Sequence, residues 1–146
     1  IGLLGLAGLQ AVSLNNNQTA YYRSIASQQA YDMADRMRAN LAGIEGGHYD
    51  DLTDANTPGS DPACVPGDAC TKAEMAQADH FQWQANTGRL LPNGQGFVCA
   101  QALPCPALPA PNDDPCPGNA FRIRVSWNEK TTEGSATQTF VTCVTP

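Results

Sequence analysis

The chain has 146 residues and a net charge of −6, and only 25 of its residues are Leu, Ile, Val or Phe. The length suits one domain. The small share of strong core formers would favour disorder, but the modest net charge and six cysteines favour a thin, cross-linked fold. An acidic chain with 8 Lys and Arg residues is a poor ligand for polyanions, which argues against nucleic-acid binding and a polybasic membrane patch.

The first segment, Ile1–Leu14, is apolar, carries no charge and begins without an initiator Met. As a helix this segment would measure about 21 Å, whereas a helix that crosses a bilayer requires roughly 20 residues, or about 30 Å. Gly2, Gly5 and Gly8 weaken a soluble helix but permit close helix contact. We favour the end of a transmembrane or assembly helix whose start was removed; the alternative is an amphipathic core helix. Partner helices are expected to contact Leu3, Leu4, Gly5, Leu6, Gly8 and Leu9.

The helix is predicted to continue to about residue 42, because no proline interrupts it and glycine is absent between Gly8 and Gly43. Apolar side chains recur every three or four residues, as on one face of a helix. This stripe comprises Tyr22, Ala26, Ala30, Met33, Met37, Leu41 and Ile44. A helix of about 60 Å is longer than the domain, so half of it must project. We therefore divide the chain into an N-terminal helix, 1–42, and a globular head, 43–146.

The head is predicted to hold a second helix from Thr71, where Thr71 and Glu74 fit a capping box, to about Thr87-Gly88. Ala76, Trp83 and Leu90 share one face of it. Strands are predicted over 96–100, 120–128 and 136–144, whereas 45–70 and the proline-rich 103–118 are predicted loops. The fold class is α+β, a long N-terminal helix on a small antiparallel sheet. The predicted helix–sheet core is Tyr22, Ala26, Met33, Met37, Leu41, Trp83, Ile123, Val125 and Trp127.

The cysteines indicate disulfides and an oxidising compartment, because their number is even and no C-x₂-C spacing suggests zinc. Six cysteines allow fifteen pairings. We expect Cys64–Cys70, since Pro-Gly-Asp between them favours a turn. Cys105–Cys116 would then close the proline-rich loop, and Cys99–Cys143 would remain.

No catalytic or cofactor site can be assembled from the sequence. Asp79 and His80 are adjacent, but neighbours on a helix point about 100° apart, so His80 is interpreted as a surface histidine. Asp50, Asp51 and Asp54 lack the spacing of a calcium loop and are interpreted as a solvated acidic loop. We expect neither an enzyme, a metal nor a small-molecule substrate.

Several segments resemble the PilV-type minor pilins of bacterial type IV pili. The N-terminal helix does so through IGLLGLAGLQA (1–11) and AYYRSIASQQAYDMADRMRAN (20–40). The head adds the C-x₅-C loop from Cys64 to Cys70, A-x-x-D-x-x-x-W (76–83), LPNGQG (91–96) and RIRVSWNE (122–129). The resemblance covers most of the chain apart from 45–63 and 101–119, and the YDMADRMRAN string is its most specific part.

The resemblance implies a disulfide-bonded prepilin that is cleaved and methylated at residues preceding this sequence. The subunit would wait in the inner membrane with its head in the periplasm, then enter a pilus used for twitching motility. It would prime assembly within a minor-pilin complex at the filament tip. Its partners would be other minor pilins, the major pilin and a tip adhesin. Alternatives are a minor pseudopilin of a type II secretion system and a secreted, disulfide-stapled binding domain.

Overall fold

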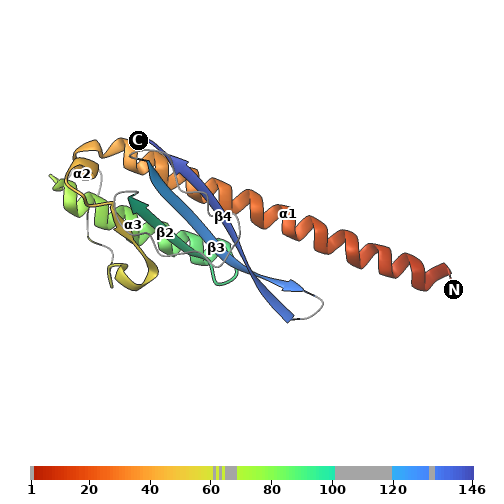
Figure 1. Ribbon diagram of the computed structural model, residues 1–146. Coiled ribbons are helices and arrows are strands. Elements are labelled where there is room, and N and C mark those ends of the chain that lie inside the picture. Colours follow the sequence, from red (N-terminus) through yellow and green to blue (C-terminus); the bar gives the residue numbers. More distant parts are fainter. Residues whose placement is uncertain (1, 61, 63, 65–68, 101–119, 132–133) are drawn as a thin grey trace.

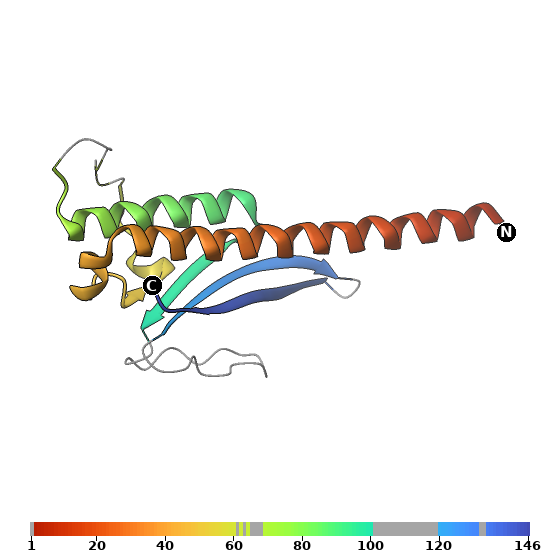
Figure 2. The same cartoon turned by 90° about the horizontal axis from the view of Figure 1, so that it is seen from above.

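The computed structural model describes residues 2–60, 62, 64, 69–100, 120–131 and 134–146. Two long helices lie on one face of an antiparallel sheet with strand order β1-β2-β3-β4 (Figures 1 and 2). This architecture confirms the predicted α+β fold. The elements are α1 (Gly2–Ala39), α2 (Leu41–Glu45), β1 (Asp51–Leu52), a 3-10 turn (Asp54–Asn56), α3 (Lys72–Leu90), β2 (Gln95–Ala100), β3 (Phe121–Thr131) and β4 (Gly134–Val144).

Helix α1 has two halves with different surroundings. Its C-terminal half packs against β3, β4 and α3, whereas its N-terminal half extends away from the head (Figure 1). The helix ends at Ala39 rather than at residue 42, because Asn40 adopts φ −127° and ψ 57°. The Asn40 side chain accepts a hydrogen bond from the Gly43 N–H at 3.1 Å and caps α2. The chain therefore starts a second, short helix at this point.

The prediction that Leu41 lies in the core is wrong, because its side chain is 54% exposed. The helical periodicity that begins at Tyr22 applies only as far as Asn40, where the α1 conformation ends. Beyond that residue the spacing no longer places side chains on the same face. Tyr22 is partly buried, and the other predicted core residues are buried.

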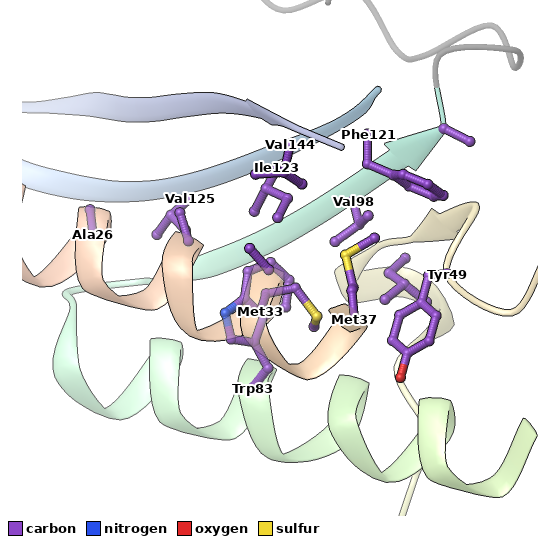
Figure 3. Close-up of a cluster of buried hydrophobic side chains, with 14 of the residues drawn as sticks. Ala26, Met33, Met37, Tyr49, Trp83, Val98, Phe121, Ile123, Val125 and Val144 are labelled. Atoms are coloured by element: carbon purple, nitrogen blue, oxygen red, sulfur yellow. The ribbon is translucent and has the colours of Figure 1, made fainter. Parts of the chain in front are cut away.

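The core fills the space between α1, α3 and the sheet (Figure 3). Strand β3 supplies Ile123, Val125 and Trp127 at alternate positions, all at most 1% exposed, as expected for one face of a strand. Met33 and Met37 of α1 meet these side chains, and Trp83 comes from α3. At about 25 cal/mol per Å² of apolar surface, burying side chains of this size is the main force that holds α1 to the sheet.

Helix α3 begins as predicted. Thr71 and Glu74 form the reciprocal capping box, and the hydrogen bonds from Thr71 lower the pKa of the Glu74 carboxyl. The helix continues past Gly88 to Leu90, which is 36% exposed, so the prediction that Leu90 shares the buried face is wrong. The following residue, Leu91, is buried instead.

The segment predicted as loop before α3 contains strand β1 and the 3-10 turn. Strand β1 is only two residues long and pairs with Val98 and Cys99 of β2. Thr53 caps the 3-10 turn reciprocally with Asn56. Elements this short carry no periodicity, which is why the sequence pattern did not reveal them.

The disulfide between Cys64 and Cys70 is present, as predicted. Cys105 and Cys116 lie outside the described residues. The predicted Cys99–Cys143 pairing is wrong, although both residues are disulfide-bonded. They pair with Arg122 from opposite sides, on β2 and β4. Two strand spacings separate their Cα atoms by about 9.5 Å, whereas a disulfide requires less than about 7 Å.

Candidate assembly surface

The projecting half of α1 exposes a dense apolar surface. The exposed fractions of its large side chains lie between 59% and 87% for Leu3, Leu4, Leu6, Leu9, Val12 and Leu14. A Cβ built on Gly5 or Gly8 would meet no other atom within 4 Å. Residues 2–14 are therefore not folded back against the head, and their leucines are available to another apolar surface. Such exposed apolar patches mark interaction sites in soluble and membrane-associated proteins.

Among the described residues, no helix combines the length and the apolar character needed to cross a membrane.

A polar junction separates this apolar end from the head. Asn15 and Gln18 belong to an uncharged run of amides, and the residue that follows this run, Thr19, contacts Glu129 of β3. Thr19 donates a hydrogen bond to Glu129 Oε2 at 3.2 Å, while the Trp127 indole N–H donates to Glu129 Oε1 at 2.9 Å. A groove of about 310 Å³ opens here; it is lined by Asn15, Gln18, Thr19, Tyr22, Pro92, Asn128, Glu129 and Lys130.

Helix α3 fixes the head to α1 through polar contacts as well as packing. The indole N–H of Trp83 donates to the Gln29 carbonyl at 2.8 Å. The guanidinium of Arg36 contacts Asp32 at 2.9 Å and Asp79 at 3.2 Å. The Trp83–Gln29 and Arg36–Asp79 bonds join two helices far apart in sequence, so they hold the head in one orientation on α1, while Asp32 positions the Arg36 guanidinium from within α1.

The Asp79 carboxylate also joins a buried polar chain. The Tyr49 hydroxyl donates to Asp79 Oδ2 at 2.6 Å, and Asn40 Nδ2 donates to the Tyr49 oxygen at 3.1 Å. Burial and the neighbouring carboxylate raise the pKa of Tyr49. Tyr49 therefore stays protonated and acts as a structural donor that links the α1–α2 corner to α3.

The interpretation of His80 as a surface histidine is wrong. Its side chain is 3% exposed, and Nε2 lies 3.3 Å from the Thr57 hydroxyl. Burial lowers the pKa of His80, partly offset by a hydrogen bond with the Thr53 backbone and by the charge of Asp54. Asp79 and His80 point to different surroundings, so they form no acid–base pair. Among the described residues, no three His, Cys, Asp or Glu side chains gather as metal ligands.

The long projecting helix, the sheet-based head and the sequence of this helix agree with one family. A family model described as Tt1218-like, type IV pilin Tt1218, matches residues 8–81, just over half of the chain. The chain belongs to this Tt1218-like family of type IV pilins. Comparisons with curated proteins and with solved structures give no match.

This type IV pilin belongs to a family whose members are in general structural subunits, and it is located in a pilus. The match includes the exposed end of α1 from Gly8 onward, the break at Asn40 and the first half of α3. It ends before β2, so strands β2, β3 and β4 are supported by the structure and not by the family match. The polar junction at Thr19 and Glu129 was not anticipated, because its two sides are 110 residues apart.

Proposed function

We propose that this pilin is a PilV-type minor pilin that primes type IV pilus assembly as part of a complex near the filament tip. The observation that carries the proposal is the exposed apolar end of α1, continuous with a half that is locked into the head. An apolar helical surface of this kind needs lipid before assembly and other pilin helices afterwards. The specific YDMADRMRAN string within the locked half supports the minor class.

The proposal includes a stage in the inner membrane with the head in the periplasm. Residues 2–14 would form the outer part of the anchoring segment, and Leu3, Leu4, Gly5, Leu6, Gly8 and Leu9 would contact neighbouring helices after extraction. The glycines allow close approach of helix backbones, which favours association in lipid and in bundles. The head would then meet other minor pilins, the major pilin and a tip adhesin.

Quantitative mass spectrometry of purified pili, with and without the gene for this protein, tests the proposal. A priming subunit is expected at a few copies per filament, and its deletion is expected to reduce the number of pili per cell much more than their length. A copy number comparable with the major pilin would contradict the minor class. Normal piliation combined with lost protein secretion would indicate a pseudopilin instead.

A further inference from the structure

The two outer edges of the sheet differ. At the β1 edge, the side chain of Asn56 bonds the backbone groups that a further strand would use. Its Nδ2 donates to the Asp51 carbonyl at 2.7 Å, and its Oδ1 accepts from the Thr53 N–H at 2.7 Å. This edge is therefore closed by the chain itself. At the opposite edge lies β4, an eleven-residue strand with the sequence GSATQTFVTCV.

Strand β4 itself lacks three features that commonly protect an edge, namely charged residues, proline and a bulge. It contains no charged residue and no proline, and its register with β3 runs from Val144 to Gly134 without a bulge. Natural sheets usually block a long edge with such residues or bulges, because unpaired backbone groups invite another strand. The sequence here leaves the edge open.

The register identifies the backbone groups of β4 that point outward. The Ala100 N–H donates to the Asp50 carbonyl at 2.8 Å, so Ala100 faces β1 and the preceding residue, Cys99, faces β3. In an antiparallel sheet, a residue directs its N–H and C=O to the same side, and successive residues alternate. Arg122 pairs with Cys99 and thus directs its N–H and C=O towards β2. Cys143, which pairs with Arg122 on β4, directs its N–H and C=O away from the sheet.

By this alternation Thr137, Thr139 and Val141 direct their N–H and C=O away from the sheet. The hydrogen bond from the Asn128 N–H to the Pro92 carbonyl, at 2.8 Å, agrees with the same alternation. Among the described residues, no backbone hydrogen bond outside the regular elements involves 134–142. Three consecutive outward positions are enough to pair with a strand of five or more residues.

We infer that the β4 edge receives an extended, uncharged strand from a different subunit of the tip complex. This inference rests on the proposed function. A second copy in the same orientation would offer its β1 edge, which Asn56 closes. A copy related by a two-fold axis would place its α1 either antiparallel or across the joined sheet, so the two apolar helix ends could not lie side by side. Strand addition of this kind takes its affinity from backbone hydrogen bonds.

Amide hydrogen exchange on the full-length protein, alone and in purified tip complexes, tests the inference. In the isolated protein, the amides of Thr137, Thr139 and Val141 are expected to exchange quickly, and those of Gln138 and Phe140 slowly. In the complex, the first group should become protected at least tenfold. Slow exchange of Thr139 in the isolated protein, or unchanged exchange in the complex, overturns the inference.

A matched pair of variants gives the second measurement. Thr139→Pro removes an outward N–H, whereas Thr139→Val keeps it; proline is tolerated at an edge where the N–H is not used. The two variants should unfold at similar temperatures, yet only Thr139→Pro should lose its copurification with co-expressed minor pilins by tenfold or more. Equal copurification of both variants overturns the inference. The proposed function is tested separately by the copy number of this subunit in purified pili and by substitutions at the apolar end of α1, so each can fail without the other.

Discussion

Trp83 of α3 lies directly against Gly96 of β2, and a Cβ at Gly96 would overlap the six-membered ring of the indole. The backbone of Gly96 is also bonded to the side chain of Gln84. Gln84 Nε2 donates to the Gly96 carbonyl at 2.6 Å, and the Gly96 N–H donates to Gln84 Oε1 at 2.9 Å. Two neighbouring residues of one helix therefore hold one glycine, by shape and by hydrogen bonding. This contact sets the distance between α3 and the sheet.

Gly96→Ala is expected to destabilise the pilin by about 1–3 kcal/mol, because the methyl group must displace a fully buried tryptophan. Gly59→Ala is the matched control, since a Cβ there would meet nothing within 4 Å. Urea denaturation followed by tryptophan fluorescence gives both values. Equal stabilities of the two variants would show that the indole can move without cost.

Leu9→Asp is expected to leave the unfolding temperature unchanged but to reduce copurification with partner pilins by at least tenfold. Leu9 is 73% exposed on the projecting half of α1, so a carboxylate there disturbs only an apolar partner or lipid. Leu41→Asp is the control, because Leu41 is 54% exposed on the short helix α2, at the opposite end of α1 from Leu9. Undiminished recovery of partners with Leu9→Asp would contradict the assembly role, as would an equal loss with the control. Gly5→Leu should act in the same direction as Leu9→Asp.

Tyr49→Phe is expected to cost about 1–3 kcal/mol, because it leaves Asp79 Oδ2 without its buried donor. The hydroxyl bonds at 2.6 and 3.1 Å are both lost, while the ring still fills its site. Tyr31→Phe, at a position that is 53% exposed, should change the free energy of unfolding by less than about 0.5 kcal/mol. Chemical denaturation of the two variants side by side decides the question.

The free energy of unfolding is expected to fall as the pH drops below the ordinary histidine pKa of 6.5. Burial lowers the pKa of His80 in the folded state, so the unfolded chain binds a proton that the folded chain resists, and acid favours unfolding. The slope from one such group is at most about 1.4 kcal/mol per pH unit.

His80→Gln should flatten this slope between pH 6.5 and 5, whereas His48→Gln, at an exposed position, should retain it. Thermal unfolding across that pH range is the measurement. If the free energy of unfolding fell only below the ordinary pKa of a carboxyl, the effect would belong to groups such as Glu74. The pKa of Glu74 is lowered in the folded state, so its protonation destabilises the fold in a more acidic range. A slope that persists in His80→Gln would exclude His80 as its source.

Peptide mapping under non-reducing conditions is expected to find Cys99 and Cys143 in two different disulfides. Their positions on either side of Arg122 prevent a direct bond. Since Cys64 and Cys70 bond to each other, Cys105 and Cys116 are the partners expected from the cysteines in the sequence. A cross-linked peptide joining residues 99 and 143 would refute the strand register.

The sequence predicted the elements that have a clear periodicity. Alternation in β3 indicated that Ile123, Val125 and Trp127 would be buried, and the spacing of Met33 and Met37 indicated the packed half of α1. Prediction from periodicity failed where a single residue changes the backbone conformation, as Asn40 does at the end of α1. It also missed contacts between distant residues, such as those of Asp79 with Arg36 and Tyr49, because such pairs leave no local pattern.

Helix α1 runs for 38 residues with no break between its apolar end and the sheet. Each residue of an α-helix advances about 1.5 Å and turns about 100°. If each residue of the apolar end took the place of its predecessor against the neighbouring helices, α1 would have to advance by about 1.5 Å and turn by about 100°, and the head would turn with it. The axial position of the leucines thus selects which side of the head faces outward from the fibre.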